Sequence, residues 1–182
     1  MTPPTWLVMD LGDVVLRFAP DARLAGLADL AGLPTDTVQA LVFESGFDDA
    51  GDRGVFGLDE YRAQLLALLG LTDTTEHRAA LIESWATAFV PNPRVLALLD
   101  RVSTPIATLS DNGPMLEAVL YDVHPEVVAR FDRILLSHAL GATKPDPEIY
   151  RRAADVLGVP ADQIAFVDDR ADNVAGATAA GW

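Results

Sequence analysis

Helical and strand-like segments alternate through the second half of the chain, and short turns join them. Short apolar runs of strand-like length cover residues 6–9, 106–109, 134–136 and 164–167. Helical spacing of apolar residues marks the segments 94–102, 114–121, 147–157 and 173–180. Strands that alternate with helices in this way form a parallel sheet covered by helices on both faces. The pattern therefore predicts an α/β fold.

A long block with helical spacing, from Ala22 to about Leu99, separates the first strand-like run from the second. Its apolar periodicity predicts four or five helices, and glycine and proline clusters predict breaks at 32–34, 46–57, 70–75 and 91–93. A chain of 182 residues suits one good core, so we expect an insertion into the sheet domain. After the last helix another strand would be expected at Trp182, so we expect either a sheet without that edge or a truncated chain.

The composition excludes several classes of protein. A formal net charge of -14 would repel nucleic acid and anionic lipid, although a local basic site could still attract a small anion. The absence of cysteine excludes disulfides, thiolate metal sites and cysteine nucleophiles. No apolar run approaches the roughly 18 residues that span a bilayer, and the N-terminus lacks a basic signal region. We expect a cytoplasmic monomer or homodimer that binds neither nucleic acid nor membrane.

Polar side chains follow each predicted strand, at the edge of a parallel sheet where ligands collect. They are Asp10 after the first strand, Ser110 to Asn112 after the second, Ser137 and Lys144 after the third, and Asp168 with Asp169 after the fourth. Lys144 is the only lysine of the chain. Residues 110–112 could instead cap the helix that begins near Pro114, and one of the two final aspartates could do the same for the last helix. Two adjacent carboxylates repel each other, however, so a bound cation explains Asp168 and Asp169 better.

This set of residues suits phosphoryl transfer. A carboxylate such as Asp10 can attack phosphorus and form an aspartyl phosphate. The attack brings two anions together, so it requires a hard cation with oxygen ligands, and Mg²⁺ fits. Lysine, a hydroxyl group and the amides of a helix N-terminus can bind the remaining phosphoryl oxygens.

Four ordered motifs resemble those of the haloacid dehalogenase (HAD) superfamily over nearly the whole chain. The residues that carry the resemblance are 8–12 (VMDLG), 107–110 (ATLS), 141–147 (GATKPDP) and 166–173 (FVDDRADN), with Gly176 and Gly181 continuing the pattern. The resemblance implies a Rossmann-like three-layer core with a parallel sheet, formed by residues 1–19 and 90–182. It also implies that residues 20–89 form the small helical cap of the family, which closes over the active site and selects the substrate.

The resemblance further implies a role for each motif residue. Asp10 would be the nucleophile and a metal ligand, Ser110 would bind the phosphoryl group, and Lys144 would neutralise nucleophile and phosphate. Asn112 would contact the substrate or cap a helix.

The last motif would supply most of the Mg²⁺ site. Asp169 would be the main acidic ligand, and Asp168 would help directly or through water. Asn173, four residues after Asp169 and one helical turn away, would orient that ligand or a bound water.

The first motif departs from the family pattern at position 12. Most family phosphatases carry a second aspartate there, which protonates the leaving group and then activates water, whereas this chain has Gly12. Glycine still offers a backbone carbonyl to the metal, but the carboxylate is lost, and Asp13 is one residue out of phase. Loss of general acid or base catalysis costs about 10² to 10⁴ in rate. A glycine at this position occurs in a sugar-phosphate phosphatase branch that the chain resembles in its DLG start and DD ending.

The sequence therefore predicts a Mg²⁺-dependent phosphatase that hydrolyses a small phosphorylated metabolite through an aspartyl phosphate at Asp10. One alternative is a metal-independent haloacid dehalogenase, which needs no acid for a halide leaving group but typically lacks the acidic pair. Another alternative is a weakly active or silent domain that binds a ligand or a protein. In the Gly-rich segment 48–57 a solvated turn is expected, and Arg53 is a weak candidate for a substrate contact. No role is predicted for the histidines.

Overall fold

The computed structural model describes residues 3–182, with a three-stranded parallel sheet at its centre. The strand order is β4 (Ile106–Thr108), β1 (Trp6–Met9), β5 (Ile164–Val167). In this register Val8 pairs with Ala107 on one side and with Phe166 on the other. The predicted α/β fold with a parallel sheet is confirmed, and all three strands end at the same edge.

The segment predicted as a strand at 134–136 runs beside β4 without forming a continuous ladder. Isolated parallel bridges join Arg133 to Ala107 and Leu136 to Ser110. Between them the hydroxyl of Thr108 accepts a hydrogen bond from the Leu135 amide at 2.8 Å. A side chain thus replaces the backbone carbonyl that a regular strand would use. The segment therefore lies where a fourth strand would lie, but its backbone hydrogen bonds to β4 are interrupted at Leu135.

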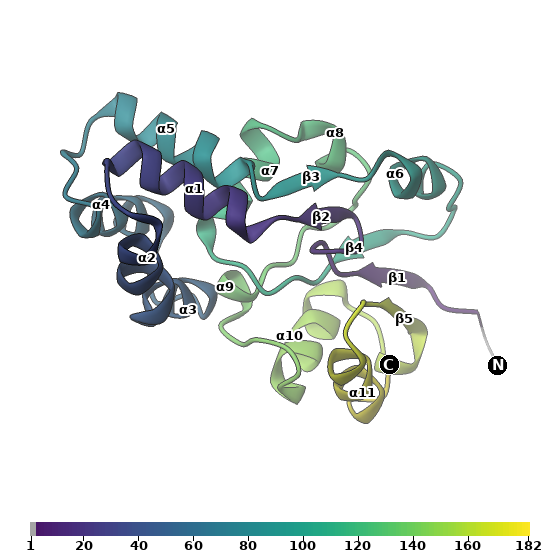
Figure 1. Cartoon of the computed structure of the whole chain (residues 1–182). Helices are drawn as coiled ribbons and strands as arrows, with labels where there is room; N and C mark the ends of the chain where they lie inside the picture. Colours follow the sequence, from purple (N-terminus) through teal and green to yellow (C-terminus); the bar gives the residue numbers. More distant parts are fainter. Residues whose placement is uncertain (1–2) are drawn as a thin grey trace.

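Helices cover the sheet on both faces (Figure 1). Adjacent residues of a strand point to opposite faces, and each face of β1 joins a different buried cluster. Val8 belongs to the cluster of α10 (Pro147–Leu157) and α11 (Ala171–Ala179), whereas Met9 belongs to that of α7 (Pro114–Asp122). The other short elements outside the insertion are α6 (Pro93–Leu99), α8 (Pro125–Val128), α9 (Ser137–Leu140) and the 3₁₀ turn η2 (Ala161–Gln163).

The insertion begins and ends on a two-stranded antiparallel ribbon, β2 (Leu16–Phe18) with β3 (Phe89–Pro91). Between these strands the chain is helical, in agreement with the predicted block. Its elements are α1 (Pro20–Ala31), α2 (Thr35–Val38), the π-helical turn η1 (Gln39–Glu44), α3 (Phe47–Asp52), α4 (Leu58–Leu68) and α5 (Thr75–Ala86). In Figure 1 these helices lie together at one end of the molecule, beside α7 and α9.

The expectation of a solvated turn over residues 48–57 is wrong for its first part, which forms helix α3. Phe47 stacks on Phe56 and lies against Tyr61, with ring centroids 5.5 and 4.6 Å apart, and these contacts anchor the helix. Gly51, read as a helix breaker, lies against the Tyr61 ring, where a Cβ would collide. The glycine therefore permits close packing rather than a turn.

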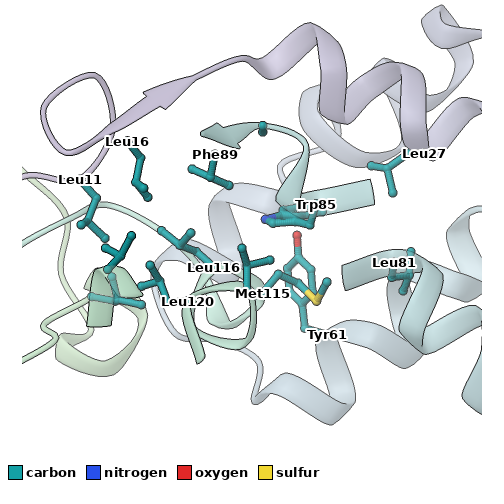
Figure 2. Close-up of a cluster of buried hydrophobic side chains, with 14 of the residues drawn as sticks. Leu11, Leu16, Leu27, Tyr61, Leu81, Trp85, Phe89, Met115, Leu116 and Leu120 are labelled. Carbon is teal, nitrogen blue, oxygen red and sulfur yellow. The ribbon is translucent and has the colours of Figure 1, made fainter. Parts of the chain in front are cut away.

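One continuous hydrophobic cluster joins the insertion to the sheet domain. Met115 and Leu116 of α7 are fully buried and lie between Leu11 near the sheet and Tyr61 and Trp85 of the insertion (Figure 2). Within residues 3–182 no helix combines the length and apolarity needed to cross a membrane.

Candidate active site

The polar residues at the strand ends line one cavity of about 290 Å³. Short loops carry them there, because β1, β4 and β5 are parallel and end together. Of the residues singled out from the sequence, the cavity lining includes Asp10, Gly12, Asp13, Ser110, Asp111, Asn112, Lys144, Asp169 and Asn173. The structure therefore brings together side chains that lie far apart along the chain.

Asp10 is the first residue after β1, and its side chain is 11% exposed. Its Oδ1 accepts a hydrogen bond from the Leu11 amide at 2.7 Å and lies 3.1 Å from Lys144 Nζ. Burial raises the pKa of the Asp10 carboxyl, while Lys144 and a hydrogen bond from Ser110 lower it. The lysine and the hydroxyl thus favour the ionised form that a nucleophile requires.

Lys144 is almost fully enclosed, with 1% of its side chain exposed. Its Nζ donates to Asp168 Oδ2 at 2.7 Å while it pairs with Asp10. The backbone is held as well, since the Lys144 amide donates to both oxygens of Asp111, at 2.9 and 3.2 Å. The ammonium group is therefore fixed between two carboxylates at the cavity wall.

Asp168 and Asp169 occupy different environments. The Asp168 side chain is fully buried, and its oxygens accept hydrogen bonds from Lys144 Nζ, the Arg170 amide and Asn173 Nδ2. Asp169 is exposed and lines the cavity. Asn173 was predicted to orient Asp169 or a bound water; the first alternative needs correction, because its amide holds Asp168 instead. Residues 168–170 precede α11, so helical spacing from Asp169 does not apply.

The capping interpretation of residues 110–112 does not hold, because Gly113 is the N-cap of α7 and no side chain caps it. Asn112 Nδ2 donates to Ser110 Oγ at 3.1 Å instead. Asp111 accepts from Lys144, and burial raises the pKa of its carboxyl to about 6. The Asn112 and Asp111 side chains thus hold other residues of the cavity wall in place and do not cap the helix.

The space beside Gly12 is open, since no atom lies within 4 Å of the position that a Cβ would take. Asp13 does not fill it with a free carboxylate, because its Oδ1 accepts a hydrogen bond from the Phe18 amide at 2.9 Å. The residue adopts a positive φ of 52° in the turn before β2. The carboxylate missing at position 12 therefore has no replacement from the neighbouring residue.

The donor set at this edge suits a hard divalent cation. Carboxylate oxygens of Asp10, Asp168 and Asp169 lie within 4.8 Å of one another. Carboxylate and carbonyl oxygens are the ligands that Mg²⁺ prefers. Of the three carboxylates Asp169 is the most accessible, whereas the hydrogen bonds to Asp168 leave it little freedom to coordinate directly.

The helical insertion contributes a second polar wall that the sequence analysis missed: Arg23, Asp48 and Asp52. The Arg23 guanidinium lies over Trp85 and Phe43, 4.4 and 4.6 Å from the ring centroids, and 3.7 Å from Asp48. Arg53, the residue singled out in this region, is exposed and does not line the cavity. The available signal was the spacing of Arg23, which lies one helical turn before Leu27 on the apolar side of the pattern, where a charge requires partners.

The comparisons with known proteins agree with this architecture. A family model described as haloacid dehalogenase-like hydrolase matches residues 52–181. A D-ribitol-5-phosphate phosphatase of Bacteroides thetaiotaomicron is 27% identical over 92% of this chain and 84% of its own length.

Solved structures show the same fold. A HAD family enzyme from Bacteroides thetaiotaomicron, in complex with magnesium and inorganic phosphate, superposes with a TM-score of 0.77 at 20% identity, covering 97% of this chain and 90% of that one. An L-2-haloacid dehalogenase from Xanthobacter autotrophicus gives a TM-score of 0.65 at 20% identity, covering 98% and 75%. Because the family model covers more than half of the chain, the protein belongs to the haloacid dehalogenase-like hydrolases, a family of enzymes.

Proposed function

We propose that the protein is a Mg²⁺-dependent phosphatase that acts on a small phosphorylated metabolite through an aspartyl phosphate at Asp10. The observation that carries this proposal is the juxtaposition of Asp10 with Asp169 and with the enclosed ammonium of Lys144 in one cavity. A nucleophilic carboxylate, a cation and an acidic metal site are the parts that phosphoryl transfer needs. The phosphatase relative and the family support this reading.

The residues around Asp10 have distinct roles in this proposal. Asp10 attacks the phosphorus, and the Ser110 hydroxyl and Lys144 ammonium bind phosphoryl oxygens. Asn112 helps to place Ser110 through its hydrogen bond. Asp168 acts chiefly by holding Lys144.

Asp10, the Gly12 carbonyl and Asp169 would hold Mg²⁺, with Asp168 at the same cluster and Asn173 fixing Asp168. The ion would neutralise negative charge as nucleophile and phosphate approach each other. Hydrogen bonds from Asn173 keep the Asp168 carboxylate in place beside this site.

We infer that the substrate is a phosphorylated sugar or sugar alcohol, and that residues 20–89 act as a cap over a core of residues 1–19 and 90–182. The D-ribitol-5-phosphate phosphatase supports the substrate class. Arg23, Asp48 and Asp52 add polar groups from the insertion that suit a hydroxylated ligand. This wall, rather than Arg53, would contact the part of the substrate beyond the phosphate.

The test is hydrolysis of 4-nitrophenyl phosphate and a panel of sugar phosphates, with and without Mg²⁺. We expect turnover that requires Mg²⁺ and that Asp10→Asn abolishes, while Asp49→Asn, an exposed change on α3, leaves it intact. Chloride release from haloacids without metal would favour a dehalogenase. Phosphate binding without any turnover would favour a silent binding domain.

A further inference from the structure

The Asp52 carboxyl group also lines the cavity, and the roles proposed for the other residues leave it without a catalytic one. We propose that Asp52, carried by the helical insertion, is the general acid and base of the phosphatase reaction and takes over the task of the aspartate missing at position 12. The inference rests on the proposed phosphatase function and assigns its proton transfer to a residue outside the four family motifs.

The position of Asp52 suits this role. It is the last residue of α3 and lines the cavity together with Asp10, Gly12 and Ser110. Its Oδ1 lies 3.3 Å from the point where a Cβ at Gly113 would be, directly over the turn between β4 and α7. The carboxyl group therefore faces the loop that begins with Ser110, the proposed phosphoryl-binding residue.

The backbone of Asp52 is fastened to the sheet domain. Ser137 Oγ, at the start of α9, donates a hydrogen bond to the Asp52 carbonyl at 2.6 Å. Gly54 adopts a positive φ of 76° and lies against the His138 carbonyl, so closely that no Cβ would fit. A catalytic side chain needs such positioning, since small displacements cost much of the rate.

The other carboxyl groups near position 12 are already committed. Asp48 accepts a hydrogen bond from the Tyr61 hydroxyl at 2.7 Å, and Asp111 accepts from the Lys144 amide. Asp13 accepts from the Phe18 amide. Among residues 3–182 no hydrogen bond to the Asp52 carboxyl group is found, so both of its oxygens are available to a ligand.

The surroundings of Asp52 favour its protonated form, which a general acid needs. Burial, and secondarily the neighbouring charge of Asp48, raise the pKa of its carboxyl to about 8. Arg23 opposes the shift, while Asp111 and Asp49 add to it. The titratable and charged groups that act on it are Asp48 and Asp49 of α3, Arg23 of α1, Tyr61 of α4 and Asp111 after β4. On α9, whose His138 carbonyl lies against Gly54, the His138 side chain pairs with Glu117.

The proton balance closes over two steps. In the first, an Asp10 oxygen bonds to phosphorus, the bond from phosphorus to the ester oxygen breaks, and the Asp52 proton passes to that oxygen, releasing an alcohol. In the second, the Asp52 carboxylate takes a proton from water, whose oxygen bonds to phosphorus as the aspartyl phosphate breaks. Phosphate leaves, and Asp10 and Asp52 return to their starting forms.

The test compares Asp52→Asn with the unaltered protein on phosphates with good and poor leaving groups, in saturating Mg²⁺. With alkyl phosphates, whose leaving oxygen needs a proton, we expect kcat/KM to fall about 10² to 10⁴-fold. With 4-nitrophenyl phosphate, whose leaving group is stable as an anion, we expect kcat/KM to change little. Because water activation is also lost, kcat should fall and a burst of 4-nitrophenolate should precede the slow phase.

Two further measurements separate this role from a structural or binding one. For the unaltered protein, kcat/KM on alkyl phosphates should fall as the pH rises through the pKa of the acid, and Asp52→Asn should lack that limb. Asp49→Asn is the matched control, since Asp49 is exposed on the same helix. It should keep the activity and the fall of kcat/KM at high pH, with that fall moved slightly to lower pH because the Asp49 charge helps to raise the pKa of Asp52.

Equal losses on alkyl and aryl substrates, or a rise in KM alone without a burst, would overturn the role of Asp52 and leave the phosphatase function standing. Turnover of aryl phosphates but of no alkyl phosphate by the unaltered protein would also overturn it. A complete lack of Mg²⁺-dependent turnover in the unaltered protein would overturn the proposed function, and this inference with it.

Discussion

At the scale of single residues, the site is organised by the enclosed ammonium of Lys144. It lies 3.1 Å from Asp10 and 2.7 Å from Asp168, and the lysine side chain is 1% exposed. Buried ion pairs contribute little net stability, but removal of one partner leaves a buried charge uncompensated. The single lysine of the chain is thus expected to be a structural requirement, in addition to the role proposed for it in phosphate binding.

Lys144→Met should destabilise the fold by about 3–5 kcal/mol near pH 8. The loss should be smaller near pH 5. Without the lysine the pKa of Asp10, already raised by burial, rises further, so the folded state holds a proton that the unfolded state releases and stability falls as pH rises. Urea unfolding at the two pH values measures this difference.

The control is Arg151→Met, which removes a cation from exposed pairs with Glu148 and Asp155 on α10. Exposed pairs contribute little to stability, so its cost should be small at both pH values. A cost for Lys144→Met that matched this control, or that did not grow with pH, would contradict the account of the buried ammonium.

At the scale of elements, the junction between α3 and α9 sets the position of the cavity wall. The Ser137 hydroxyl holds the Asp52 carbonyl, and Gly54 allows the chain to pass against the His138 carbonyl. A hydrogen bond of this kind contributes about 1 kcal/mol. The junction therefore links the helical insertion to the segment that follows β4 in the sheet.

Gly54→Ala should destabilise the protein by about 1–3 kcal/mol, because the added Cβ meets the His138 carbonyl and the positive φ disfavours alanine. The same change should reduce phosphatase activity, since it displaces Asp52. Gly57→Ala is the matched control: φ is -75° and no atom lies within 4 Å of the added Cβ. Equal stability of the two variants in urea would show that the junction is loose.

At the scale of the whole molecule, the insertion and the sheet domain share one hydrophobic cluster. Met115 and Leu116 of α7 pack between residues of both parts (Figure 2). A buried apolar surface shared by two parts couples their unfolding, since neither keeps its core without the other. The cap proposed for residues 20–89 is therefore expected to fold together with the core.

Unfolding should accordingly be a single cooperative transition. Trp85 reports on the insertion, and Trp182, packed on Tyr150 and Phe166, reports on the sheet domain. In variants that keep only one of these two tryptophans and also replace Trp6, the urea midpoint by fluorescence should coincide with the midpoint of the same variant by far-UV circular dichroism. An earlier transition for Trp85 would show instead that the helical insertion unfolds on its own.

The sequence by itself determined what depends on local signals. Helix α10 has the predicted bounds because Asp146 caps its first turn, Pro147 suits its first position and Gly158 adopts the left-handed conformation at its end. Strand ends could likewise be read from apolar runs. Since parallel strands end at one edge, the gathering of Asp10, Ser110 and Asp169 followed from topology.

Only the tertiary structure decided the features that depend on contacts between distant segments. The Asp52 carboxyl group reaches the cavity because Phe47 and Gly51 pack α3 against Tyr61, a contact that no local pattern encodes. Asn173 holds Asp168 rather than Asp169 because the helix starts after both. Burial then raised the pKa of Asp52, and burial arises only when the chain is folded.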